Sequence, residues 1–188
     1  MTSIGAYLAE MQQVLAGMDE NAIEQTVSHI YRVWKQRRQV FLIGNGGSAA
    51  TASHMANDLS KATIVAGKAR LRAVALTDNI SLITAWANDT SYDNVFKEQL
   101  ENLLEKGDLV LGISASGESA NILLAIDFAR QQGAATVGWT GRSGGRMRGI
   151  VDLAVCVPSS DVGMIEGCHM VLDHLVTTEL RRLISAEA

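Results

Sequence analysis

The sequence is poor in the residues that mark several classes of protein. It has only two cysteines, and neither belongs to a Cys-x-x-Cys pair, which argues against a disulfide framework or a zinc knuckle. Cys156 lies in the apolar run LAVCVP and Cys168 in EGCHMVLDH, so we expect both to be reduced thiols. The single proline, Pro158, follows the last apolar run, where it can end a strand.

Long apolar runs and basic blocks are also missing. No window approaches the roughly 18 uninterrupted apolar residues that a membrane span needs, and the N-terminus lacks the basic-then-apolar pattern of a signal peptide. The longest basic block is KQRR at 35–38 and the net charge is −4, so a nucleic acid is not expected as a ligand. We therefore expect a cytoplasmic protein with no membrane and no nucleic acid among its partners.

The pattern of apolar residues predicts a single α/β domain. The chain has 188 residues, 47% of them apolar, which suits one compact core. Helical spacing predicts two helices within residues 3–38, broken around 17–19. Strands are predicted at 40–44, 72–77, 109–114, 135–141 and 153–158, and helices at 48–61, 80–87, 91–105, 119–132 and 164–185. This alternation predicts a three-layer sandwich, with a central five-stranded parallel sheet buried on both faces.

A glycine loop, Gly44-Asn45-Gly46-Gly47-Ser48, follows the first predicted strand. In open α/β sheets, ligands bind at the carboxyl ends of strands, where helix N-termini direct free N–H groups at an anion. Glycines let the backbone approach a ligand, and Ser48 can cap the helix or bond a ligand oxygen. The same residues also suit an ordinary strand-to-helix turn, and this loop alone does not decide between the two.

A second loop, with three hydroxyls around Gly117, follows the third predicted strand. Ser114, Ser116 and Ser119 crowd one turn before a helix, although a single serine would suffice to cap it. Several hydroxyls with nearby backbone N–H groups suit the oxygens of a phosphate. Neither loop matches a Walker A or a G-x-G-x-x-G nucleotide motif. We therefore expect a phosphorylated ligand that is not a nucleotide.

Two pairs of titratable side chains lie on predicted helices. His54 and Asp58 are four residues apart, so they face the same way and can share a ligand, although a solvated ion pair has the same spacing. Glu166 and His174 are eight apart, about 12 Å along a helix, which is long for two ligands of one ion. His169 lies about 140° around the helix from His174 and is expected to be packed. Together, the two pairs could supply Zn²⁺ with two imidazoles, from His54 and His174, and one or two carboxylates, from Asp58 and Glu166.

Together with TGRSGG at 140–145, the two loops resemble the phosphosugar loops of the sugar isomerase (SIS) domain family. The order and spacing of motifs over about residues 40–180, including AND at 87–89 and EGCHMVLDH, are most similar to those of the phosphoheptose isomerases. The resemblance implies an SIS phosphosugar-binding domain at 39–188 and N-terminal helices at 1–38 that pack on the domain and on partner subunits. It also implies a homo-oligomer, expected to be a tetramer, with sites between subunits.

The resemblance also implies roles for single residues. In phosphoheptose isomerases the positions of His54, Asp58, Glu166 and His174 hold His, Glu, Gln and His, which bind zinc, so one Zn²⁺ per site is expected. Asp58 and His174 match the acid-base residues. Asp58 is one methylene shorter than the family's Glu, which withdraws the carboxylate by roughly 1 Å, and Glu166 replaces a neutral amide by a charge. Substrate contacts are expected at Asn45, Gly46, Gly47, Ser48, Asp89, Ser114, Ser116, Ser119, Asp161 and Glu166.

The activity implied by the resemblance is the aldose–ketose isomerisation of D-sedoheptulose 7-phosphate to D-glycero-D-manno-heptose 7-phosphate. This is the first step towards the activated heptoses of lipopolysaccharide and other surface polysaccharides. Proton transfer through an enediol needs a base, an acid and stabilisation of negative charge. Two alternatives stay open. One is a non-catalytic regulator that binds a phosphosugar or a protein, like the replication-initiator-associated branch of the family, and the other is an isomerase of another phosphosugar.

Overall fold

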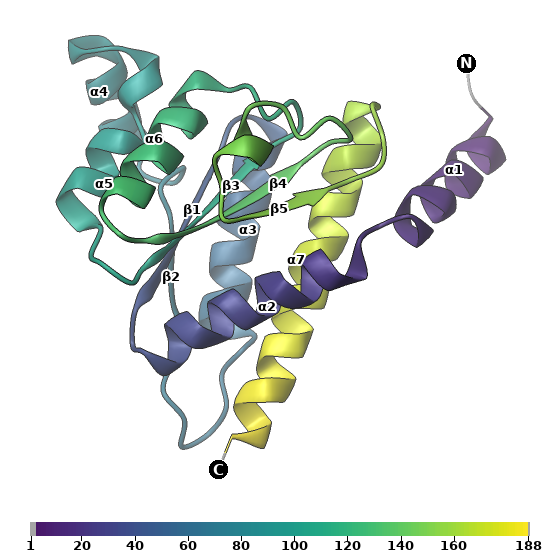
Figure 1. The fold of residues 1–188 in the computed structure, drawn as a ribbon, viewed down its shortest axis with the longest axis horizontal. Coiled ribbons are helices and arrows are strands. Elements are labelled where there is room, and N and C mark those ends of the chain that lie inside the picture. The colour runs from purple at the N-terminus through teal and green to yellow at the C-terminus, as the bar shows by residue number, and fades with distance from the viewer. Residues whose placement is uncertain (1–2, 188) are drawn as a thin grey trace.

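Five parallel strands form the centre of the protein, in the order β2-β1-β3-β4-β5. The computed structural model of the chain describes residues 3–187, and Figure 1 shows the strands between two layers of helices. The strands are β1 (Gln39–Gly44), β2 (Arg72–Ala75), β3 (Leu109–Ser114), β4 (Ala135–Thr140) and β5 (Leu153–Cys156). The predicted five-stranded parallel sheet is thereby confirmed, with each strand at its predicted place along the chain.

Helices connect the strands and cover both faces of the sheet. They are α1 (Ile4–Ala16), α2 (Glu20–Lys35), α3 (Gly47–Lys61), α4 (Ile80–Asp89), α5 (Lys97–Leu103), α6 (Ala120–Gln131) and α7 (Val162–Ala186), with 3₁₀ turns η1 (Tyr92–Asn94) and η2 (Met147–Gly149). The single helix predicted at 91–105 is wrong. The chain turns at Val95 and Phe96, whose side chains are buried in the core, and this turn separates η1 from α5.

Side chains alternate between the two faces of the sheet along each strand, and each face packs into a separate hydrophobic core. Val40 and Leu42 of β1 are fully buried against α2, α3 and α7. Phe41 and Ile43, which point the other way, are buried with residues of α6 and with the Val95–Phe96 turn. The architecture is therefore the expected three-layer α/β sandwich, with α3 and α7 side by side on the face that also carries α2.

The expectation that all five strands are buried on both faces is wrong for β2. Arg72 and Val74 of this strand are exposed, and Val74 keeps 39% of its surface accessible. The reason is the position of β2 at the edge of the sheet, where only β1 pairs with it. The inner strand β3 is buried along its whole length.

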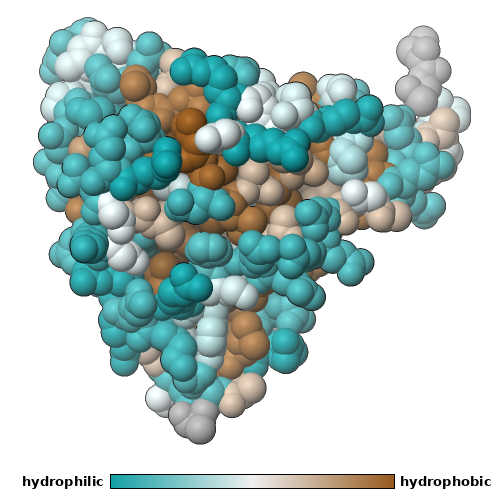
Figure 2. Space-filling model, in the orientation of Figure 1, coloured by the Kyte–Doolittle hydropathy of each residue, from teal (hydrophilic) through white to brown (hydrophobic). Residues whose placement is uncertain are grey.

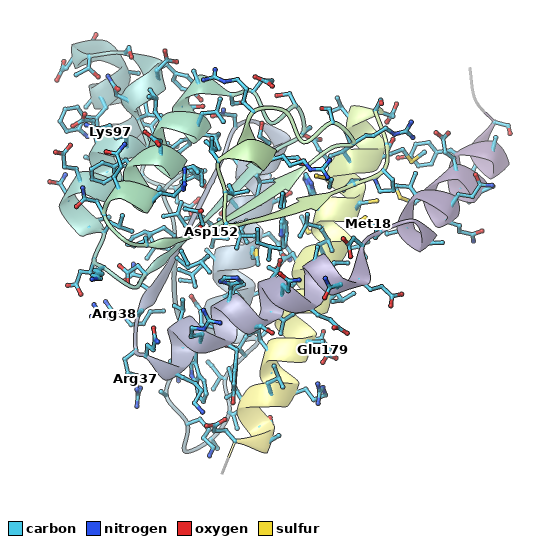
Figure 3. The ribbon with its side chains drawn as sticks, in the orientation of Figure 1. Met18, Arg37, Arg38, Lys97, Asp152 and Glu179 are labelled. Atoms are coloured by element: carbon cyan, nitrogen blue, oxygen red, sulfur yellow. The ribbon has the colours of Figure 1, made fainter. Side chains whose placement is uncertain are left out.

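The two N-terminal helices differ in how they meet the rest of the molecule. α2 packs on the sheet and on α7, whereas α1 extends beyond the body of the protein, at the right of Figure 1. Met18, labelled in Figure 3, lies at the junction of the two helices and is partly buried. Ile4, Tyr7 and Leu8 of α1 are exposed, and Figure 2 shows that the projecting helix carries both hydrophilic and hydrophobic residues.

The structure also bears on membrane insertion. Within residues 3–187, none of the helices combines the length and the apolar character that crossing a bilayer requires.

Candidate active site

The strand order places the two predicted ligand loops next to each other. From β1 the chain crosses to β2 on one side, and from β3 it crosses to β4 on the other, so the sheet changes direction between β1 and β3. In open parallel sheets, the crevice at such a point is where ligands bind. A cavity of about 230 Å³ lies here, lined by residues of both loops and of α7: Asn45, Ser48, Ile113, Ser114, Ala115, Ser116, Ser119, Val162 and Glu166.

The first loop depends on its glycines. Gly46 has φ 55° and ψ −122°, a conformation that a residue with a Cβ avoids. The N-cap residue of α3 is Gly46, not Ser48, and Gly46 has no side chain that could cap the helix. Ser48 lies in the first turn, where its buried side chain lines the cavity. A Cβ on Gly47 would collide with the carboxylate of Glu166, so this glycine makes room for Glu166 beside the loop.

The second loop gathers three hydroxyl groups above the N-terminus of α6. The Oγ of Ser114 lies 3.3 Å from the Oγ of Ser119 and 3.5 Å from that of Ser116. Ser114 accepts a hydrogen bond from the N–H of Gly117, and Ser116 accepts one from the N–H of Glu118. Ser119 is the N-cap residue of α6, but its side chain makes no capping hydrogen bond. Its hydroxyl is therefore available to a ligand that the helix N-terminus also attracts.

An amide pair ties the two loops together. Asn45 and Asn121 donate to each other's side-chain oxygens, each at 2.9 Å, and the hydroxyl of Tyr92 donates to the Asn45 oxygen at 2.9 Å. Asn121 is buried, so this exchange satisfies its amide. Neither Asn121 nor Tyr92 was among the site residues predicted from the sequence. The only signal was the position of Asn121 in the first turn of a helix that follows a candidate phosphate loop.

Four titratable side chains meet where α3 packs against α7. His54 and Asp58 come from α3, and Asp173 and His174 come from α7. The Nε2 atoms of the two histidines are 3.2 Å apart, and the Oδ2 of Asp58 lies 3.6 Å from the Nε2 of His54 and 3.9 Å from that of His174. One ligand atom from each of the four residues lies within 4.8 Å of all the others. The structure therefore brings together three of the four residues that the resemblance gave to the metal.

Asp173 is the fourth member of this group, and it was not among the site residues predicted from the sequence. Its side chain has no exposed surface, and burial, followed by the negative charge of Asp58, raises its pKa to about 6. Its Oδ1 accepts a hydrogen bond from Thr177 at 3.4 Å. Among residues 3–187, its Oδ2 has no hydrogen-bond partner. The signal in the sequence was a charged residue on the apolar stripe of α7, between Leu172 and Val176.

Glu166 is not part of this group. It lies eight residues, or about 12 Å of helix axis, before His174 and lines the cavity beside the serines instead. Two other expected contacts lie elsewhere among the described residues. Asp161 caps α7 by accepting from the N–H of Met164 at 2.9 Å, and Asp89 is exposed at the end of α4. Neither lines the cavity in the single chain.

His169 is packed, as the helical spacing predicted. Its ring is fully buried, and its Nε2 lies 3.3 Å from the carbonyl oxygen of Thr140. Burial lowers its pKa to about 4, although the hydrogen bond to Thr140 acts in the opposite direction. The neutral imidazole therefore helps to hold α7 against the end of β4.

Comparison with known proteins gives a consistent result. The model of a family described as "SIS domain" matches residues 6–141. The phosphoheptose isomerase of Aliarcobacter butzleri is 38% identical over 93% of this chain and 87% of its own length. That of Burkholderia pseudomallei is 40% identical, over 94% and 91%.

Solved structures agree with this. The phosphoheptose isomerase of Francisella tularensis superposes with a TM-score of 0.90 at 28% identity, over 97% of this chain and all of its own. That of Neisseria gonorrhoeae has a TM-score of 0.88 at 29% identity, over 95% and 97%. The similarity in sequence and in fold thus extends over nearly the whole chain.

Proposed function

Since the chain belongs to the SIS domain family and, within it, to the phosphoheptose isomerases, we propose that it converts D-sedoheptulose 7-phosphate to D-glycero-D-manno-heptose 7-phosphate. One observation carries the proposal. Two imidazoles and a partly buried carboxylate meet on α3 and α7, the two helices that also line the cavity beside the serine loop. An aldose–ketose isomerase needs this combination of an acid, a base and an anion site.

The serine loop binds the phosphate. Ser114, Ser116 and Ser119 present their hydroxyls on one side of the cavity, and the N-terminus of α6 adds free N–H groups and a positive dipole end. Ser48, Asn45 and Glu166 line the same cavity and contact hydroxyls of the sugar. Holding the phosphate in this way fixes the position of the distant carbonyl carbon.

Asp58 and His174 move the protons. Asp58 Oδ2 removes the proton from C1 of the ketose, which gives the enediol. His174 Nε2, 3.9 Å from that oxygen, moves the proton between the two oxygens of the enediol, and Asp58 returns a proton to C2. When C2 has received this proton, the C1–oxygen bond of the enediol becomes the aldehyde of the product. Both groups lie on packed helices, which hold their separation constant.

The donor set suits one zinc ion per site. Two imidazole nitrogens and a carboxylate oxygen that converge in this way are the ligands that Zn²⁺ prefers in proteins, and no cysteine is required. His54, Asp58 and His174 would hold the ion. When bound, it would stabilise negative charge on the oxygens of the substrate.

We also place the enzyme in the cytoplasm, as a homotetramer with its sites between subunits. The exposed apolar side chains of α1, at Ile4, Tyr7 and Leu8, support association with a second copy. The small size of the cavity in one chain supports a site that a neighbouring subunit completes.

Proton exchange in D₂O tests the activity. Purified zinc-loaded protein is incubated with D-sedoheptulose 7-phosphate, and deuterium at C2 of the aldose product is read by NMR. Pentulose and hexosamine phosphates run in parallel distinguish an isomerase of another phosphosugar. Saturable binding of the heptulose phosphate without exchange would identify a non-catalytic protein instead.

A further inference from the structure

We propose that Asp173 is a protein ligand of the divalent metal, together with His54, Asp58 and His174. The proposal rests on the metal site described above, and it concerns the same cluster on α3 and α7. Two observations carry it: the burial of Asp173 and the distances between the four ligand atoms.

The first observation is an unpartnered buried oxygen. The Asp173 side chain has no exposed surface, and within residues 3–187 its Oδ2 has no hydrogen-bond partner. Among the same described residues, the other oxygen, Oδ1, accepts a hydrogen bond from Thr177 alone, at 3.4 Å. A buried carboxylate is costly unless a cation or several donors face it. The Oδ2 lies 3.9 Å from the Nε2 of His54, on the side where the cluster converges.

The second observation is the spacing of the four ligand atoms. Tetrahedral ligands at about 2.0 Å from a zinc ion are about 3.3 Å from one another. The measured separations within the cluster are 3.2 Å between the histidines, 3.6 and 3.9 Å from Asp58 to the histidines, and 3.9 Å from Asp173 to His54. These separations, and the 4.8 Å within which all four ligand atoms lie, are close to those of atoms that share one zinc ion.

Within one chain, Glu166 lies apart from this cluster. One turn of α7 separates it from the N-cap residue Asp161, and two turns separate it from His174. Gly47 gives it space beside the phosphate loop, where it lines the cavity. Within one chain its carboxylate therefore lines the cavity, and the second carboxylate of the cluster comes from Asp173.

This assignment changes the charge and the orientation of the metal centre. Two aspartates and two neutral imidazoles balance Zn²⁺, whereas a set with one carboxylate and one amide leaves one positive charge. Asp173 forms the buried floor of the site, while the side chains of His54 and His174 keep 43% and 56% of their surface exposed. A bound ion would therefore be held more tightly than by one carboxylate and one amide.

A pair of matched variants tests the assignment on the full chain. We compare Asp173→Asn, which removes the ligand charge with little change in shape, with Glu166→Gln, which does the same in the cavity. Zinc affinity is measured by chelator competition, and the absorption spectrum of the Co²⁺-loaded protein reports the ligand set. Loss of a direct ligand should weaken binding at least about 100-fold in Asp173→Asn. Glu166→Gln should bind zinc like the wild type.

Thermal unfolding without metal separates this result from misfolding. Asp173→Asn and a second variant, Asp173→Leu, remove an unpaired buried charge, so their metal-free Tm should equal or exceed that of the wild type. Zinc should raise the Tm of the wild type and of Glu166→Gln, but not of the two Asp173 variants. Wild-type zinc affinity in Asp173→Asn would overturn the proposal, as would loss of zinc only in Glu166→Gln. These readouts need no substrate, so a failure of the isomerase assay leaves them unaffected.

Discussion

The Nε2 atom of His54 lies 3.2 Å from the Nε2 atom of His174, although 120 residues separate them in the chain. Two imidazole nitrogens at this distance either form a hydrogen bond with each other or face a common cation. Their helices, α3 and α7, pack together over several turns. The packing of these helices, rather than a loop, therefore sets the geometry of the proposed acid-base site.

Asp58→Asn should lower the turnover of the isomerase by about 10²–10⁴-fold, because an amide cannot accept the proton from C1. Steady-state turnover at saturating zinc and substrate measures the effect. Asp58→Glu is the matched control: it keeps a carboxylate, although one methylene further out, and should retain much more activity. A rate near that of the wild type in Asp58→Asn would remove Asp58 from the role of base.

Ser119→Ala should raise KM for the phosphosugar about tenfold or more with a smaller change in turnover. The lost hydrogen bond is made to a charged phosphate, and such bonds contribute about 1.5–3 kcal/mol. Ser185→Ala, at an exposed position near the end of α7, is the control and should have no effect. Equal KM values for the two variants would contradict the assignment of the serine loop to the phosphate.

Gly46→Ala and Gly47→Ala should fail for different reasons. Alanine at position 46 must adopt φ 55° and ψ −122°, which costs about 1–3 kcal/mol of stability. Alanine at position 47 keeps a helical backbone but displaces the Glu166 carboxylate, a flexible group. Thermal unfolding should therefore detect mainly the first variant, and substrate KM should be affected by both. A large loss of Tm in Gly47→Ala alone would contradict this account.

His169 should make the protein less stable in acid. The folded state holds its pKa near 4, below the unfolded value of 6.5, so the unfolded chain binds more protons between these pH values. The contribution is fully present above about pH 6.5, decreases as the pH falls to 4, and amounts to about 3 kcal/mol.

The matched variant for this prediction is His169→Gln, which can still donate a hydrogen bond to Thr140 but does not titrate. Urea unfolding from pH 7 to pH 4 should show a shallower loss of stability in the variant than in the wild type. Parallel curves for the two proteins would show that His169 is not the group responsible.

Much of the fold could be predicted from the sequence, because apolar periodicity reports local structure directly. The runs at 40–44 and 109–114 became β1 and β3, and the two loops after them lie side by side as the parallel sheet requires. The exposure of Val74 on β2 could not be predicted, since the strand order decides which strand lies at the edge.

The candidate site could be predicted only in part. Spacing on one helix indicated that His54 and Asp58 face the same way, but no local pattern shows which residues of α7 reach them. The approach of Asp173 depends on the rotation of α7 against α3, a property of tertiary packing. In the same way, the pairing of Asn121 with Asn45 depends on the adjacency of β1 and β3.

The hydroxyl of Tyr92 reaches back to the Asn45 side chain from the crossover that follows β2. That crossover, which includes α4 and η1, is a segment of the chain separate from the two ligand loops. Replacing this segment by that of a relative should therefore change which sugar chain lengths and stereoisomers bind, while the serine loop that binds the phosphate stays the same. Breadth of substrate choice could thus evolve, or be engineered, independently of the proton-transfer machinery.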